Sequence, residues 1–207
     1  MNPRGLAKAL VRAVASGTVA PLVAAYRLEL AVSPGDRRDP VFQSYSQALG
    51  LVPGLTGQFL RRAFYGAVLT RCDPASLINW GTVFSSADVT ISEGVYIGAR
   101  CMIGRAVLEP HVTIGSNVDI LSGKNQHNFE DPDKPLQQQG GRFERVRIGT
   151  NSWLGNGSIV LADVGARCVV AAGAVVVNDL PDDVIVGGNP ARVLKRRDPA
   201  TGQWVKP

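Results

Sequence analysis

The sequence predicts a mainly β protein in which a parallel β-helix follows an N-terminal α-helical region. Glycine makes up 23 of the 207 residues, against a usual share of about 7%. From residue 91 onward an aliphatic residue recurs about every six positions, whereas the first 72 residues have apolar side chains at helical spacing. With 45% hydrophobic residues the chain can bury a core, and a disordered chain is excluded.

Residues 1–72 are predicted to be helical, because apolar residues return every three or four positions. The first helix is expected to break between Gly17 and Pro21, and a turn is expected over residues 33–36. A second helical stretch starts near Val41, stops at Pro53-Gly54 and resumes to Leu69. The apolar positions that carry the first part of the pattern are Leu6, Leu10, Val14, Leu22, Val23, Tyr26 and Leu30.

The basic charge of the chain lies in this helical part. Residues 1–71 hold nine Lys/Arg and three Asp/Glu, a net +6, while the whole chain is +5. Arg4, Lys8 and Arg12 are four apart and share one helix stripe. Two interpretations stay open: a peripheral membrane contact through these basic helices, and a helical cap packed on the next domain, which we favour.

Membrane crossing and nucleic-acid binding are both disfavoured. The stretch Ala13–Ala25 is weakly apolar, is interrupted by Gly17 and Pro21, and is shorter than the about 20 apolar residues that a span needs. No zinc-finger spacing or aromatic and basic stacking platform appears. Three cysteines without a Cys-x-x-Cys pair favour the reducing cytoplasm.

The repeats occupy most of the remaining chain. Typical blocks read Ile97-Gly-Ala-Arg-Cys-Met, Ile114-Gly-Ser-Asn-Val-Asp and Ile148-Gly-Thr-Asn-Ser-Trp. A fixed short period indicates one structural unit that buries its apolar face only by stacking on its neighbours. Six residues suit a short strand and a corner, with the second-place glycine expected to allow the corner backbone. Cys101 and Cys168 both take the fifth place, so they are predicted to be inward-facing and unreactive.

The repeats divide the chain into three regions. An α-helical region covers 1–72, the β-helix covers 73–190 with an inserted loop over 121–147, and a basic tail covers 191–207. The loop is long and polar, and loops of this length inside a compact domain are usually functional or disordered. The tail holds four basic residues between Arg192 and Arg197, which would attract phosphate.

These repeats and their interruption resemble the hexapeptide-repeat acyltransferases, which fold as left-handed parallel β-helices. The resemblance covers about residues 78–197 and is closest to the maltose, galactoside and polysaccharide O-acetyltransferases. Its most specific stretches are Ile120-Leu-Ser-Gly-Lys-Asn-Gln-His127, Ile148-Gly-Thr-Asn-Ser-Trp153-Leu-Gly, and Val170-Ala-Ala-Gly-Ala-Val with the later Val186-Gly-Gly-Asn-Pro190-Ala-Arg192-Val-Leu-Lys195.

The resemblance implies a cytoplasmic, homotrimeric enzyme that transfers an acetyl group from acetyl-CoA, or another acyl group from its CoA ester, to a sugar or polysaccharide-precursor hydroxyl. His127 matches the general base, and imidazole can accept a proton near neutral pH. Three carboxylates are alternatives for orienting its ring: Asp119, Glu130 and Asp131.

The other implied site residues belong to the acceptor and CoA sites. Trp153 is the acceptor-site candidate. For CoA, the pantetheine arm would run along Asn156 and Ala172, and its phosphates would meet Arg192 and Lys195.

Alternatives from other classes remain. An N-acyltransferase acting on an amino sugar would use the same base, and a non-catalytic β-helix assembly module would use none of these residues. A metal hydratase is disfavoured and no metal is expected, because its zinc site needs three imidazoles and the chain has two histidines. The second one, His111, is expected to be a solvated surface residue. The loop reads His-Asn-Phe-Glu-Asp where the sugar-acetylating branch commonly has His-Pro, so the acceptor stays open.

Overall fold

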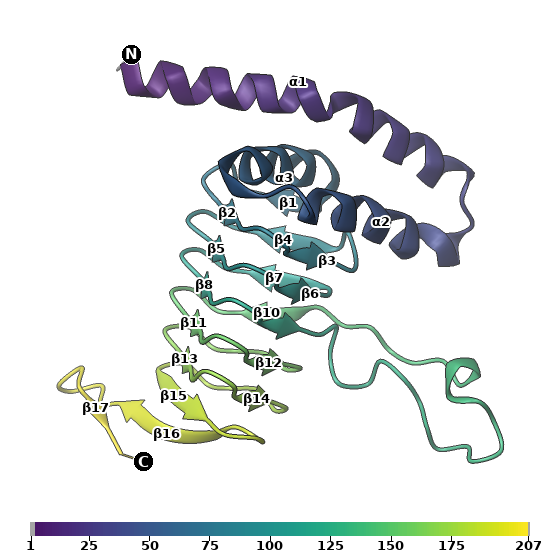
Figure 1. Cartoon of the computed structure of the whole chain (residues 1–207). Coiled ribbons are helices and arrows are strands. Elements are labelled where there is room, and N and C mark those ends of the chain that lie inside the picture. Colours follow the sequence, from purple (N-terminus) through teal and green to yellow (C-terminus); the bar gives the residue numbers. More distant parts are fainter. Residues whose placement is uncertain (1–2, 207) are drawn as a thin grey trace.

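The computed structural model describes the backbone of residues 3–206 and the side chains from Ala9 to Lys206. Three α-helices cover one end of a slender β-solenoid, and a long loop projects from its side (Figure 1). The predicted mainly β, left-handed parallel β-helix with an N-terminal α-helical extension is therefore confirmed. Arg4 and Lys8, two members of the predicted basic stripe, lie outside the described side chains.

The helical region is a cap on the first coil. Helix α1 (Pro3–Val32) leads through the short 3-10 helix η1 (Gly35–Arg37) to α2 (Arg38–Gly50) and α3 (Gly54–Val68). The predicted break at Gly17–Pro21 is wrong, because α1 continues through Pro21 and only bends along its length (Figure 1). An interior proline removes one backbone hydrogen bond, and packing on the other helices offsets that loss.

Aromatic side chains join the cap to the solenoid. The Tyr26 ring lies 6.1 Å from Phe42 and 6.0 Å from Phe64, and the Tyr65 ring lies 4.7 Å from Phe84 of the first coil. These rings interlock edge to face, an arrangement that adds to the gain from burial. The cap is therefore part of the same hydrophobic core as the repeats.

Arg61 of α3 fixes the junction by polar contacts. Its guanidinium is fully buried and donates to the backbone carbonyls of Leu49, Val52 and Ile78 at 3.0, 2.7 and 3.1 Å. Burial lowers the pKa of Arg61. Arg61 thus ties the α2–α3 connection, through Leu49 and Val52, to Ile78 of the first coil.

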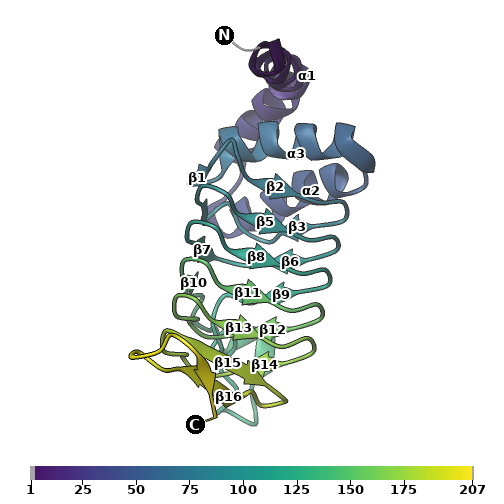
Figure 2. The same ribbon diagram turned by 90° about the vertical axis from the view of Figure 1, so that its left-hand side faces the viewer.

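The solenoid consists of three parallel sheets, A, B and C, whose strands follow one another in this order from β1 to β12 (Figure 2). In the last coils only the single bridges of Val164 and Leu180 continue sheet A. Sheet A contains β1 (Arg71–Cys72), β4 (Val89–Ile91), β7 (Ala106–Leu108) and β10 (Val146–Ile148). Sheet C contains β3 (Val83–Phe84), β6 (Met102–Ile103), β9 (Asp119–Ile120), β12 (Ile159–Val160) and β14 (Val175–Val176).

Sheet B is the longest. It contains β2 (Leu77–Ile78), β5 (Tyr96–Ile97), β8 (Thr113–Ile114), β11 (Trp153–Leu154), β13 (Val169–Val170) and β15 (Val184–Gly187), all parallel. Two antiparallel strands then extend it, β16 (Arg192–Arg197) and β17 (Trp204–Val205). Within the predicted basic tail, β16 and β17 thus form an antiparallel hairpin.

The aliphatic residues of the repeats form the core as expected. Ile97, Ile114, Ile148 and Leu154 are fully buried, and Cys101 and Cys168 are buried beside them. Burial raises the pKa of both thiols, which disfavours the reactive thiolate. The predicted structural role of these cysteines is consistent with this environment.

The prediction that the second-place glycines turn the corners of the coil is wrong. The left-handed corner residue is in the fourth place of the repeat, where Arg100, Asn117 and Asn151 have φ of 56°, 57° and 59°. The second-place glycines serve coil stacking instead, because a Cβ on Gly98 would lie 2.4 Å from the Gly115 carbonyl oxygen. Glycine is needed there for close backbone approach rather than for its dihedral freedom.

Candidate active site

The loop over 121–147 is an internally bonded arm. It leaves sheet C after β9 and returns to sheet A at β10 (Figure 1). Its two legs bond to each other, with Glu144 N donating to Ser122 O at 2.9 Å and Arg142 N to Asn125 O at 2.8 Å. Its tip contains the 3-10 helix η2 (Leu136–Gln138). The hydrogen bonds between the two legs thus fix the backbone conformation from which the side chains of the arm project.

His127 lies on the outgoing leg and its side chain is exposed. Its ring meets Phe143 of the returning leg edge to face, with 6.4 Å between centroids. Phe143 is in turn covered by the Arg105 guanidinium at 5.7 Å, and Arg105 pairs with Asp39 of α2 at 3.2 Å. The imidazole therefore sits on an aromatic support that is tied to the body of the protein.

Gly141 makes this approach of the two legs possible. A Cβ at this position would lie 1.9 Å from the Gln126 carbonyl oxygen and 2.9 Å from the His127 nitrogen. Phe143 and Gly141 were not predicted as site residues. The Gly140-Gly141 pair in the polar loop is the sequence signal that marks this contact.

Over the described residues, no hydrogen bond or ion pair joins His127 to any of the three carboxylates proposed to orient it. Glu130 accepts from the Phe129 N–H at 3.0 Å, and Asp131 accepts from the Asp133 N–H at 3.1 Å. Asp119 is in β9 and lines a surface pocket that also includes Met102 and Gln126, the residue before His127. Of the three, Asp119 is therefore the one at the base of the arm.

The residues proposed for CoA lie on another edge of the prism. Asn156 and Ala172 are exposed and follow the sheet B strands β11 and β13, at the corner that leads into sheet C. The Asn156 Oδ1 accepts from Ser116 N at 2.9 Å, which fixes the side chain along the corner. Trp153 is 53% exposed on the outer face of sheet B, between Thr113 and Val169.

The basic residues of the hairpin have different surroundings. Arg192 and Lys195 are exposed on β16. Arg197 instead donates to Asp183 at 3.0 Å and lies 4.4 Å above the Trp204 ring. Arg192 also donates to the Ala191 carbonyl at 3.3 Å. Arg197 donates to the Gly202 carbonyl at 2.9 Å, which helps to hold the hairpin closed.

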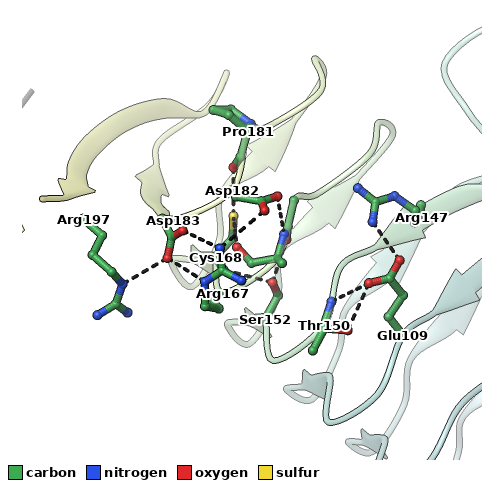
Figure 3. Close-up of polar contacts among 12 residues, drawn as sticks. Glu109, Arg147, Thr150, Ser152, Arg167, Cys168, Pro181, Asp182, Asp183 and Arg197 are labelled. Atoms are coloured by element: carbon green, nitrogen blue, oxygen red, sulfur yellow. Dashed lines mark hydrogen bonds and ion pairs between the residues drawn. The ribbon is translucent and has the colours of Figure 1, made fainter. Parts of the chain in front are cut away.

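A further polar ladder lies at the corner between sheets A and B (Figure 3). The Glu109 carboxylate accepts from Arg147 at 2.7 Å and from the Thr150 N–H at 2.8 Å, and the Arg147 contact lowers the pKa of Glu109. Asp183 accepts from Arg167 at 2.8 Å. These pairs link successive coils, so we assign them to the scaffold.

One chain does not bring the predicted residues into one cluster. His127 belongs to the arm at the corner between sheets C and A, whereas Asn156 and Ala172 belong to the corner between B and C. His111 is exposed at the corner between A and B, as expected, with φ of 61°. Among residues 3–206, no group of three His, Cys, Asp or Glu could hold a metal ion.

No family model matches the chain. A Saccharomyces cerevisiae protein described as an acetyltransferase is 35% identical over 116 residues, covering 53% of this chain and 57% of the relative. The galactoside O-acetyltransferase of Lactococcus lactis is 30% identical over 125 residues, covering 58% of this chain and 53% of the relative. The chain thus spans a little over half the length of these relatives.

Solved structures share the fold. A maltose O-acetyltransferase from Clostridium difficile superimposes with a TM-score of 0.55 at 20% identity, over 76% of this chain and 87% of that one. An N-acyltransferase from Bacillus cereus, solved with dTDP and 3-hydroxybutyryl-CoA, has a TM-score of 0.50 at 22% identity, over 59% and 70%. The repeats, the shared fold and the sequence relatives together confirm the predicted resemblance to the hexapeptide-repeat acyltransferases, in particular to their sugar O-acetyltransferase branch.

Proposed function

We propose that this chain is an acyl-CoA-dependent acyltransferase that acetylates a sugar or polysaccharide-precursor hydroxyl. The observation that carries the proposal is His127: an exposed imidazole on the ordered arm that interrupts the repeats, supported by the Phe143 ring at 6.4 Å. The names of the sequence relatives support acetyl transfer, and the galactoside enzyme supports a saccharide acceptor.

His127 would act as the general base. Its neutral imidazole takes the proton of the acceptor hydroxyl while the oxygen attacks the thioester carbonyl. The C–S bond then breaks, and the imidazolium returns the proton to the departing CoA thiolate. Direct transfer needs no acyl-enzyme, in agreement with the burial of Cys101 and Cys168.

Acetyl-CoA, or another acyl-CoA, would lie along the corner that carries Asn156 and Ala172. The exposed Ala172 leaves room for the pantetheine arm, and Arg192 and Lys195 on β16 would pair with the phosphates. The fold neighbour from Bacillus cereus was solved with an acyl-CoA, which supports a CoA ester as co-substrate.

A complete site would require a second copy of the chain. His127 and the Asn156 corner are on different edges of one prism, so the base of one subunit would face the CoA track of its neighbour. A homotrimer provides three such sites by repeating one heterologous contact. We propose a cytoplasmic location from the free cysteines.

Replacing His127 tests the proposal. His127→Asn is expected to lower the rate of CoA release by at least about a hundredfold, because general-base catalysis contributes that much. Acetyl-CoA should still raise the melting temperature, since the track is intact. The assay screens mono- and disaccharides, nucleotide sugars and amino sugars, and preferred acylation of amino sugars would assign N-acyl transfer instead.

The second histidine provides the matched control. His111 has φ of 61°, a conformation that asparagine tolerates, so His111→Asn should keep both fold and activity. Activity of His127→Asn within a few fold of the unaltered chain would refute the assignment of the base. Absence of any acetyl-CoA shift for the unaltered chain would favour the assembly module.

A further inference from the structure

Helix α1 rests on the cap by one face. Val19, Val23 and Tyr26 of this face are buried against the other helices, although Ala9–Val32 is long and apolar enough to cross a membrane by length and composition alone. A groove of about 570 Å³ runs between α1 and α3 on the same side of the helix. This volume is within the range of about 300–1,000 Å³ that is usual for small-molecule pockets.

The floor of the groove consists of small and apolar residues, which are Ala15, Val19, Ala20, Val23, Ala63 and Gly66. Close packing of two helices accounts for such residues where the helices touch. It does not account for the open space above Gly66, where an added Cβ would meet nothing within 4 Å. The groove therefore has room for a hydrocarbon chain over this part of α3.

Two arginines border one end of the groove. Arg12 comes from α1 and Arg62 from α3, and both line the groove. Burial lowers the pKa of Arg62 most, and the nearby charge of Arg12 lowers it further, so the two guanidiniums repel each other. The salt bridges between described residues include neither arginine. This end thus holds two positive charges that the described part of the chain does not pair.

The remaining border of the groove offers nothing that would repel an anion. Among the described residues that line it there is no Asp or Glu, and Asp73, which precedes the lining residue Pro74, accepts from the Ala75 N–H at 2.7 Å. Arg27 lies about 22 Å further along α1, at 1.5 Å per residue. Its guanidinium donates to the Ala67 carbonyl at 3.3 Å and closes the far end of the groove.

We propose that this groove binds an alkyl phosphate, with its phosphate between Arg12 and Arg62 and its hydrocarbon chain over Gly66 toward Arg27. A phosphate monoester carries a charge of about −1.5 to −2 at pH 7, which suits two guanidiniums, whereas a carboxylate would neutralise only one. Each guanidinium can donate two parallel hydrogen bonds to phosphate oxygens. The groove shares no residue with the proposed active site, so it is a second binding site whose test does not depend on acyl transfer.

Calorimetric titration of the full chain with octyl phosphate, below the concentration at which it forms micelles, tests the proposal. One molecule is expected to bind per chain. Inorganic phosphate lacks the hydrocarbon chain and octyl glucoside lacks the charge, so each should bind at least about tenfold more weakly. Equal affinity for inorganic phosphate would indicate a simple anion site and would overturn the proposal. Equal affinity for octyl glucoside, or no binding of octyl phosphate, would also overturn it.

Substitutions in the groove separate its two parts. Arg12→Gln and Arg62→Gln should each weaken octyl phosphate binding by at least about tenfold, because each removes a charged hydrogen-bond donor. Gly66→Leu should weaken it to a similar extent at unchanged charge, because the new side chain fills the space that the hydrocarbon chain would take.

Arg37→Gln is the matched control, because Arg37 is an exposed arginine of η1 outside the groove. It removes the same charge from the cap and should bind octyl phosphate like the unaltered chain. Circular dichroism melts without ligand establish that each variant is folded. Undiminished binding by Arg62→Gln or Gly66→Leu, or an equal loss in Arg37→Gln, would refute the site.

Discussion

At the residue scale, the place of a residue in the repeat decides what it does. Fourth-place residues turn the corner with positive φ, so Asn, Arg and Asp occur there beside glycine. Second-place glycines face the backbone of the next coil. At Gly165, for instance, an added Cβ would lie 2.5 Å from the Asp182 nitrogen and 2.6 Å from the Pro181 carbonyl carbon. Both neighbours are backbone atoms, which cannot rotate away from the added Cβ as a side chain could.

Gly165→Ala is therefore expected to destabilise the fold by about 1–3 kcal/mol, the usual cost of overpacking a close contact. Gly66→Ala in α3 should instead stabilise it by about 0.5–1 kcal/mol, because nothing lies within 4 Å of the added Cβ. Urea unfolding followed by circular dichroism measures both. Equal effects of the two substitutions would contradict the stacking argument.

The sequence predicted where some site residues lie but not which side chains they contact. His127 stands in the longest interruption of the period, so its place on an exposed loop followed from the sequence. Its support by Phe143 required the fold, because the two residues are 16 positions apart and meet only when the legs of the arm pair. The choice among Asp119, Glu130 and Asp131 likewise depends on side-chain positions that no spacing fixes.

At the element scale, one carboxylate adds side-chain ion pairs to the β15–β16 pairing that holds the C-terminal hairpin. Asp183 accepts from Arg167 of the preceding coil and from Arg197 of β16, at 2.8 and 3.0 Å (Figure 3). The Arg167 hydrogen bond lowers the pKa of Asp183 most, and Arg197 adds to it. A single side chain thus connects the solenoid to the strand that carries Arg192 and Lys195.

The stability of the folded chain should therefore depend on pH through Asp183. Because the folded-state pKa is below the ordinary value of 3.8, the contribution of Asp183 to stability is present above about pH 4 and is lost as the pH falls through the lowered value. Asp183→Asn should cost at most about 1 kcal/mol at pH 6, as is usual for exposed pairs, and should shrink the difference in urea midpoint between pH 6 and pH 3.

The control for this prediction is Asp133→Asn, whose carboxylate has no hydrogen bond or ion pair to the rest of the described chain. It should leave the pH dependence unchanged. Asparagine is suitable at both positions, and at Asp183 it also tolerates the φ of 58°. If Asp183→Asn keeps the pH dependence of the unaltered chain's urea midpoint, the Asp183 carboxylate does not stabilise the hairpin.

At the scale of the whole molecule, the proposed site is divided between subunits, and this can be tested by mixing. His127→Asn removes the base and Ala172→Trp blocks the exposed track, so each variant alone should be inactive. In trimers assembled from equal amounts of both, about one quarter of the interfaces combine an intact base with an intact track. About one quarter of the unaltered activity should therefore return.

A site contained within one chain would give no recovery in the mixed sample, and a monomeric mass in sedimentation would exclude shared sites.

The sequence by itself determined the solenoid, the inserted loop, the inward direction of Cys101 and Cys168 and the helical first third. Each of these follows from a short period, in which a residue's neighbours depend only on its place in the repeat. Only the tertiary structure decided that α1 runs unbroken through Pro21, that residues 192–205 fold back as a hairpin, and that His127 and Asn156 lie on different edges of the prism. These outcomes depend on contacts between residues distant in sequence, whose packing energy outweighs local preference.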